Sequence, residues 1–217
     1  MDKLGPYELN TIITGDAREL AKAIPDESVD LVFTDPIYSN IDDYRWLAET
    51  AARVLKPDSA CLVWFDEPNF DAIYRSMTPI LSFAAFMHWQ RYGHLAPSRS
   101  GITVISPCLW LEVGKSKTYK RIANWCGVPN GLGVSNFHWS KPMILLRKWV
   151  DAFTLDGSTV FDPFTGGGTV PAVCKMLGRN YLAFEIDPAT ADMARERVAN
   201  TQPPLFVDGP QQTEMEL

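Results

Sequence analysis

Short apolar runs alternate with amphipathic stretches in the first and last thirds of the chain, a pattern typical of strands followed by helices. The run 60–65 is apolar almost throughout, as expected for a strand buried on both faces. In 42–56 the apolar residues recur at helical spacing and stop before Pro57. We predict strands at 10–14, 29–34, 60–65, 158–162 and 180–186, and helices at 42–56, 66–79, 141–153, 168–178 and 188–199.

The middle of the chain follows a different pattern. Segments 81–92 and 104–113 resemble longer β segments, and 114–138, rich in Gly, Asn, Ser, Lys and Trp, is expected to be irregular. The alternation elsewhere predicts an α/β fold with a mostly parallel sheet and helices on both faces. We divide the chain into one α/β core (1–84 and 139–200), a basic and aromatic insert (85–138) and a flexible C-terminal tail (201–217).

The charge of the chain is unevenly distributed. The formal net charge of the 217 residues is −6, which by itself argues against a nucleic-acid partner. Between 85 and 150, however, nine Lys and Arg residues stand against one acid, Glu112, so this block carries +8 and the remainder −14. On charge alone, an anionic partner and a merely solvated cationic surface explain the block equally well.

Composition excludes several classes of protein. No apolar run approaches the roughly 18 residues of a membrane span, and we see no signal segment at the start. The cysteines lack zinc-ligand spacing, so we expect no metal site and reduced thiols in a cytoplasmic protein; they are Cys61, Cys108, Cys126 and Cys174.

Two segments of the last third suggest a nucleoside site. Residues 160–170 join an apolar strand to a helix through three glycines, which allow a ligand to approach the backbone. Neither a phosphate loop nor a dinucleotide fingerprint fits their spacing. Glu185 ends the next strand, 19 residues after Gly166, where a ribose diol is usually held, whereas Asp187 is equally well explained as a helix cap. A unit that binds ribose but no pyrophosphate points to S-adenosylmethionine.

Asp35-Pro-Ile-Tyr38 follows the predicted strand 29–34 and suits chemistry on an amine. The lone pair of an exocyclic base amine is delocalised into the ring. A carboxylate from Asp35 and the carbonyl of Pro36 could accept its two hydrogens and localise that lone pair, while Tyr38 stacks on an extruded base. Taken alone, the motif is equally well explained as a turn after a strand.

Together these segments resemble the amino-methylating DNA methyltransferases, and most closely the permuted β class, in which the catalytic motif precedes the cofactor motif. Asp35-Pro-Ile-Tyr38 resembles the family's D-P-P-Y motif, and Phe161-Asp-Pro-Phe-Thr-Gly-Gly-Gly168 its cofactor loop. Three further segments resemble family motifs in the expected order: Gly15-Asp16, His138-Trp-Ser-Lys-Pro142 and Phe184-Glu-Ile-Asp187. The sequence departs from the pattern at Ile37 and Trp139, where the family has proline.

The resemblance implies a Rossmann-like methyltransferase fold, S-adenosylmethionine as cofactor and a role for each matched residue. Asp16 should bind the adenine amine, Glu185 the ribose hydroxyls and Asp162 the methionine ammonium. Asp35, Pro36 and Tyr38 are the expected catalytic residues. The other expected cofactor contacts are Asp35, Lys141 beside the carboxylate, Phe164, Gly166 and Gly168.

The insert is the expected DNA-binding part, because its cations are interleaved with aromatic residues. The candidate phosphate contacts are Arg91, Arg99, Lys115, Lys117, Lys120 and Arg121. By resemblance, a homodimer and a restriction-modification system are compatible with the chain. Because cytosine-N4 enzymes of this type more often have serine first in the catalytic motif, Asp35 favours adenine N6 in DNA. Three alternatives stay open: cytosine N4, an RNA or protein amine, and a catalytically weak DNA-binding protein, suggested by Ile37.

Overall fold

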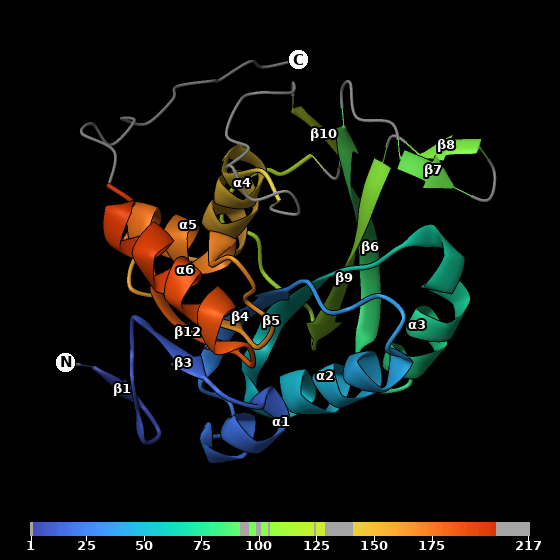
Figure 1. Cartoon of the computed structure of the whole chain (residues 1–217). Coiled ribbons are helices and arrows are strands. Elements are labelled where there is room, and N and C mark those ends of the chain that lie inside the picture. The colour runs from blue at the N-terminus through green and yellow to red at the C-terminus, as the bar shows by residue number, and fades with distance from the viewer. Residues whose placement is uncertain are drawn as a thin grey trace, which may run out of the picture.

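The computed structural model describes residues 2–91, 96–98, 101–103, 105–123, 125–128 and 141–202 (Figure 1). Its strands are β1 (Lys3–Leu4), β2 (Tyr7–Glu8), β3 (Thr11–Thr14), β4 (Val29–Thr34), β5 (Leu55–Trp64), β6 (Ser82–Arg91), β7 (Ala96–Ser98), β8 (Gly101–Thr103), β9 (Ile105–Val113), β10 (Trp125–Val128), β11 (Thr159–Asp162) and β12 (Asn180–Glu185). Its helices are α1 (Ala17–Leu20), α2 (Ile41–Val54), α3 (Phe70–Met77), α4 (Met143–Phe153), α5 (Thr169–Leu177) and α6 (Pro188–Asn200), with 3₁₀ turns at Ala21–Ala23 and Glu67–Asn69.

A mostly parallel sheet forms the centre of the described chain. Eight strands lie in the order β10-β6-β9-β5-β4-β11-β12-β3, and only β9 runs antiparallel to its neighbours. At the middle of the sheet, Val32 of β4 pairs with Cys61 of β5 on one side and with Phe161 of β11 on the other. The predicted α/β fold with a mostly parallel sheet is confirmed.

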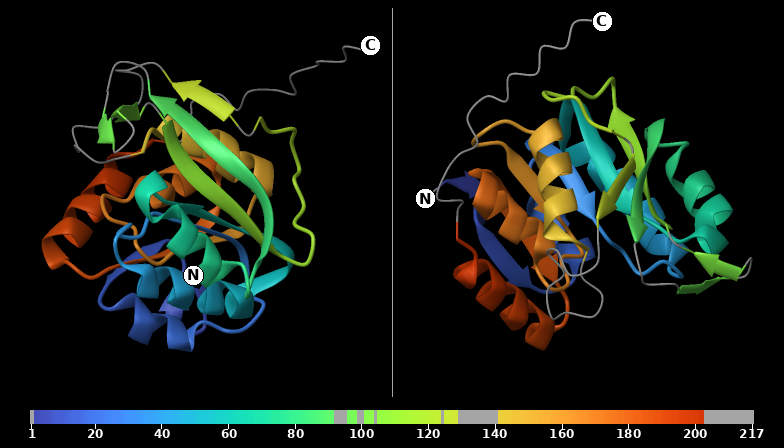
Figure 2. Two further views of the ribbon diagram at one scale, coloured as in Figure 1. Left: turned by 90° about the vertical axis from the view of Figure 1, so that its right-hand side faces the viewer. Right: turned by 90° about the horizontal axis from the view of Figure 1, so that it is seen from above.

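Alternate residues of the strands face two separate hydrophobic cores. On β5, Leu62 and Trp64 belong to the core covered by α4, α5 and α6, whereas Cys61 and Val63 belong to the core covered by α1, α2 and α3. The two groups of helices lie on opposite sides of the sheet in the view from above (Figure 2, right). Burial on both faces explains why these strands are apolar almost throughout.

The order of the strands reverses between β4 and β11. From β4 the chain continues through α2 to β5 on one side, and from β11 through α5 to β12 on the other, on the opposite face of the sheet. In open α/β sheets, such a switch point leaves a crevice at the carboxyl ends of the strands, where ligands bind. We call this end of the sheet the carboxyl edge and the opposite end the amino edge.

Strands β6, β9 and β10, which lie wholly or partly in the predicted insert 85–138, belong to the central sheet. Strands β6 and β9 extend it beyond β5, and Met87, Cys108 and Leu111 are buried in its cores. Strand β10 pairs with β6 inside a segment that we expected to be irregular. The β7–β8 hairpin forms a separate two-stranded sheet, at the upper right of Figure 1. The sequence did not predict this extension of the sheet, because the pairing of β9 with β5 is a contact between distant segments that the local pattern does not reveal.

Two further outcomes concern the ends of the chain. Of the predicted tail, only 201 and 202 are described, so its flexibility stays a prediction. No helix in the described ranges is long and apolar enough to cross a membrane.

Gly168 provides a test of how α5 packs against α6. Its φ is +73°, and an added Cβ would lie 2.9 Å from Cβ and 3.1 Å from the backbone oxygen of Ala194. Gly157 has a similar φ, +76°, but open space around it. We expect Gly157→Ala to cost about 1 kcal/mol of unfolding free energy through backbone strain, and Gly168→Ala about 1–3 kcal/mol more through the clash. Urea unfolding of both variants measures this, and equal losses would contradict the described packing.

Candidate active site

A cavity of about 330 Å³ opens at the carboxyl edge, at the switch point between β4 and β11. Its volume is within the range of small-molecule sites, about 300–1,000 Å³. Its lining comes from the ends of β4, β5 and β11, the glycine turn and three helices: Thr34, Asp35, Trp64, Lys141, Leu146, Asp162, Phe164, Thr165, Gly166, Gly167, Thr169, Val170, Thr190 and Met193. Five residues predicted to bind cofactor, drawn from distant segments, therefore meet in one cavity: Asp35, Lys141, Asp162, Phe164 and Gly166.

Asp162 is buried at the point where the two halves of the chain meet. The hydroxyl of Thr34, the last residue of β4, donates to Asp162 Oδ1 at 2.7 Å, and the amide of Phe164 donates to the same oxygen at 3.3 Å. Burial nevertheless dominates, and it raises the pKa of Asp162 from 3.8 to about 7. A cationic group in the cavity would stabilise the charged form of this carboxylate.

The glycine turn is held by Glu185 and by Arg197. Glu185 Oε2 accepts from the amide of Gly166 at 2.9 Å, and its Oε1 accepts from the amide of Asp187 at 3.0 Å. Arg197 of α6 donates to the carbonyl of Gly167 at 3.0 Å. A Cβ added at Gly166, whose φ is +50°, would meet no atom within 4 Å, so this position faces open space. Glu185 is thus not in the lining itself but is hydrogen-bonded to Gly166, which is.

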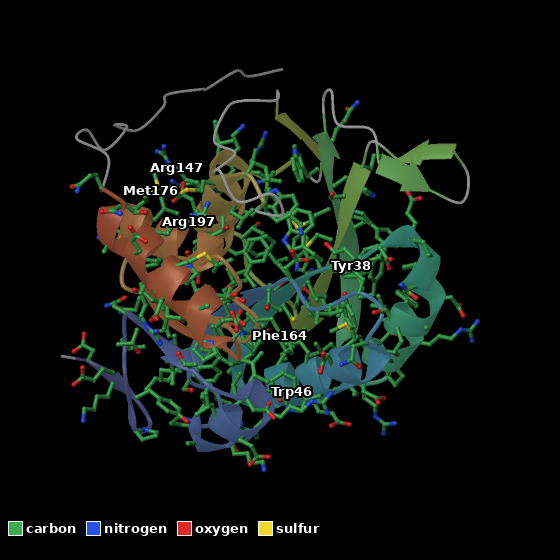
Figure 3. The ribbon with its side chains drawn as sticks, viewed as in Figure 1. Tyr38, Trp46, Arg147, Phe164, Met176 and Arg197 are labelled. Atoms are coloured by element: carbon green, nitrogen blue, oxygen red, sulfur yellow. The ribbon has the colours of Figure 1, made fainter. Side chains whose placement is uncertain are left out.

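An aromatic pair borders the cavity on the side of α2. The rings of Phe164 and Trp46 meet edge to face with their centroids 5.6 Å apart (Figure 3). Arg18 lies over the Trp46 ring, 5.9 Å from its centroid. Asp16 caps α1 by accepting from the amide of Arg18 at 2.8 Å, and it is exposed. Asp16 follows β3, which pairs with β12, so it lies at the same edge as Glu185 but outside the cavity lining.

Asp35 is tied to Lys141. The Lys141 ammonium forms an ion pair with Asp35 Oδ2 and donates to the hydroxyl of Tyr38 at 3.0 Å. It also lies 5.0 Å from the centroid of the Trp64 ring. The other carboxylate oxygen, Asp35 Oδ1, is buried and has no hydrogen-bond partner in the described part of the chain. The expected catalytic side chains therefore share one cation.

The rest of the catalytic motif is arranged as a turn. Pro36 is buried, whereas the side chain of Ile37 is 72% exposed, and the Ile37 carbonyl accepts from the amide of Asn40 at 3.0 Å. Because the side chain of Ile37 is exposed, replacing the family's second proline by Ile37 changes the conformational freedom of the backbone and not the packing of the core.

Four of the predicted phosphate contacts lie at the amino edge, away from the cavity. The amide of Lys115 and the ammonium of Lys117 bind Asp58, which is six residues from Trp64 along β5, or about 20 Å. Lys120 pairs with Asp151 near the end of α4, and the exposed Arg121 follows it directly.

The other two predicted phosphate contacts are only partly described. Arg91 ends β6, which continues past the register of Trp64, so its backbone lies on the cavity side. Arg99 is outside the described residues, as are His138 and Trp139 of the proposed cofactor motif.

Several lining residues were not among those named from the sequence. Thr34, Trp64 and Thr165 border the cavity, and the first two lie at the ends of the predicted strands 29–34 and 60–65, which was the available signal. Gly168, expected to bind the cofactor, is the N-cap of α5, lies against Ala194 and is not among the lining residues.

Residues 109–196 match the family model described as DNA methylase, of the N6 and N4 amino-methyltransferases. The resemblance to this family is confirmed. The match includes the cavity-lining residues from Lys141 to Met193, whereas Asp35 precedes it.

Two curated relatives align with most of the chain. The Type II methyltransferase M.HinfI of Haemophilus influenzae is 24% identical over 90% of this chain and 70% of its own length. M.BamHI of Bacillus amyloliquefaciens is also 24% identical, over 92% of this chain and 60% of its own length. The chain thus spans about two thirds of the length of these relatives.

Solved structures confirm the methyltransferase fold. M1.HpyAVI, solved in complex with S-adenosylmethionine, superposes with a TM-score of 0.72 at 23% identity, over 87% of this chain and 98% of its own. The cytosine-N4-specific PvuII methyltransferase superposes with a TM-score of 0.74 at 19% identity, over 86% of this chain and 85% of its own.

The residues of the cavity fit an aminoacyl nucleoside such as S-adenosylmethionine. One buried polar atom of the lining, Asp35 Oδ1, has no hydrogen-bond partner in the described part of the chain. Unpartnered buried polar groups are costly unless a ligand satisfies them. Carboxylates for an ammonium group and open space at the glycine turn lie together in this cavity.

The raised pKa of Asp162 gives a prediction about stability. Between pH 4 and 7 the folded chain keeps a proton that the unfolded chain has lost, so this residue contributes less stability as the pH rises towards its folded pKa of about 7. Asp162→Asn keeps an acceptor for Thr34 without the charge. Relative to the unaltered protein, we expect this variant to gain thermal stability at pH 8 but not at pH 5. The same change in melting temperature at both pH values would contradict the assignment.

Proposed function

We propose that the protein transfers a methyl group from S-adenosylmethionine to the N6 amine of adenine in DNA. The observation that carries this proposal is the meeting of Asp35, Asp162 and the glycine turn in one cavity at the switch point. The DNA methylase match and the fold of the solved relatives support it. A cytoplasmic location and a homodimer stay predictions.

The cofactor assignment places each part of the molecule next to a complementary group. Asp162 would bind the methionine ammonium, Glu185 the ribose hydroxyls and the Gly166 turn the nucleoside, with Phe164 at its side. Glu185 has lone pairs beyond the two used for the amides of Gly166 and Asp187, since an ionised carboxylate offers about four acceptor sites. When bound, the cofactor supplies an electrophilic methyl group.

The protein's own part in the reaction is to localise the lone pair of the target amine. Asp35 and the carbonyl of Pro36 would accept the two amine hydrogens, and the half-buried Tyr38 would stack on the extruded base. Asp35 Oδ1 is suited to this role because Oδ2 already holds Lys141. Asp35 in first place also supports adenine rather than cytosine.

DNA would approach along the carboxyl edge, where the cavity opens. Arg91 and the β7–β8 hairpin lie beyond this edge and would supply phosphate contacts together with Arg99. Lys115, Lys117, Lys120 and Arg121 would contact DNA only where it passes the amino edge. Lys and Arg contacts to phosphate would make the affinity salt-dependent.

Incubation with DNA and methyl-labelled cofactor, followed by digestion to nucleosides, tests the function. We expect label in N6-methyladenine. Label only in N4-methylcytosine would refute the adenine assignment, label on RNA or protein alone would refute DNA as the substrate, and cofactor-independent DNA binding without any label would favour the catalytically weak DNA-binding protein suggested by Ile37.

Asp35→Asn should reduce kcat by about 100-fold or more, because the amide cannot act as an anionic acceptor for the amine hydrogens. Binding of S-adenosylhomocysteine, measured by calorimetry, should persist. Asp30→Asn is the matched control, since Asp30 lies at the amino edge on β4, the strand that Asp35 follows, and pairs with Lys56 at 2.7 Å. Turnover by Asp35→Asn close to that of this control would show that the catalytic assignment is wrong.

Glu185→Ala should weaken the binding of S-adenosylhomocysteine by about tenfold or more, because the ribose hydroxyls lose their acceptor. The control is Asp187→Ala, which removes the cap of α6 by a side chain that accepts from the amide of Thr190 at 2.8 Å. That change should cost about 1 kcal/mol of stability but leave the affinity nearly unaltered. An unchanged dissociation constant for Glu185→Ala would refute the ribose contact.

A further inference from the structure

Lys141 lies at the centre of the site. It immediately precedes Pro142, the N-cap of α4, and its side chain is only 11% exposed. Its ammonium contacts the Asp35 carboxylate, the Tyr38 hydroxyl at 3.0 Å and the face of the Trp64 ring at 5.0 Å. Two of these partners have proposed roles toward the target: Asp35 accepts from its amine, and Tyr38 stacks on its base.

Lys141 is also the single cation in the described lining of the cavity, where the other charged groups are Asp35 and Asp162. Its interaction with Oδ2 leaves Oδ1 of Asp35 as the carboxylate oxygen without a partner. The ion pair therefore divides the two oxygens of Asp35 into one that holds the cation and one that can accept from a ligand.

A rigid aromatic stack supports the ammonium. Trp64 stacks on Trp149 with ring centroids 5.2 Å apart, and Phe33 lies 6.4 Å from Trp64, so all three rings are fixed in the core. The electrostatic attraction between a cation and the face of such a ring holds the ammonium in place. Because these rings are buried in the core, the ammonium links the positions of Asp35 and Tyr38 to the core as well as to their own loop.

We propose that Lys141 is a positioning residue for methyl transfer, which aims Asp35 Oδ1 at the target amine and fixes Tyr38 beside it. This inference rests on the proposed function and deepens it. It gives Lys141 a role toward the target base, in place of a role confined to the carboxylate of the cofactor. Small displacements of positioning groups are costly, since a shift of about 1 Å can reduce a rate by about 100-fold.

Lys141→Met tests the proposal, because it keeps the apolar stem over Trp64 but removes the ammonium. We expect kcat to fall by about 100-fold, while the KM for DNA and the dissociation constant of S-adenosylhomocysteine stay within about threefold. Lys141→Arg retains a cation, so its kcat should be about a tenth or more of that of the unaltered protein. Lys56→Met is the matched control, since it breaks the ion pair between Lys56 of β5 and Asp30 of β4, the strand that Asp35 follows, and it should leave kcat unchanged.

A second measurement does not depend on methyl transfer. With 3-fluorotyrosine at position 38, the fluorine resonance should move in Lys141→Met and coincide with that of the unaltered protein in Lys56→Met. If the unaltered protein methylates no DNA, the proposed function fails, and this spectrum alone decides whether Lys141 positions Tyr38.

Three results would overturn the proposal. The first is an unchanged kcat with weakened cofactor binding, which would confine Lys141 to the cofactor. The second is an equal loss of kcat in Lys56→Met, which would show a general effect of losing an ion pair. The third is a fluorine resonance that does not respond to Lys141→Met.

Discussion

The buried hydrogen bond from Thr34 to Asp162 is the interaction on which the rest of the site depends. It joins β4 to β11 across 128 residues of sequence, at the point where the order of the strands reverses. Asp35 follows one partner directly, and the glycine turn follows the other. Because parallel strands end at the same edge, one hydrogen bond fixes the catalytic motif and the cofactor loop relative to each other.

The charges of the molecule are distributed according to this arrangement. Three buried or half-buried acids lie at the carboxyl edge: Asp35 and Asp162 line the cavity, and Glu185 accepts from the amide of Gly166 in the adjacent turn. One cation, Lys141, balances part of that charge in the described lining. The net charge of −6 is no measure of how the protein meets a polyanion, because the segment 85–150 carries +8 and the remainder of the chain −14.

Much of the core and of the site was predictable from sequence, and the failures have physical causes. Strand 29–34 matches β4 at both ends, because burial on both faces leaves a continuous apolar run. Five cavity residues were named in advance, because they stand in segments that resemble motifs of the amino-methyltransferases. The strand β10 was missed, since four residues that include Gly127 are too short for a periodic pattern. The ion pair between Lys141 and Asp35 spans 106 residues, and no local pattern encodes such a contact.

The central claim is that one cavity at the switch point holds the cofactor next to Asp35, and a crystal structure with bound S-adenosylhomocysteine tests it most directly. The account predicts the ribose hydroxyls within hydrogen-bonding distance of Glu185, the ammonium at Asp162 and the sulfur facing Asp35. A ligand bound at the amino edge, or in the cavity with its ribose away from Glu185, would contradict it.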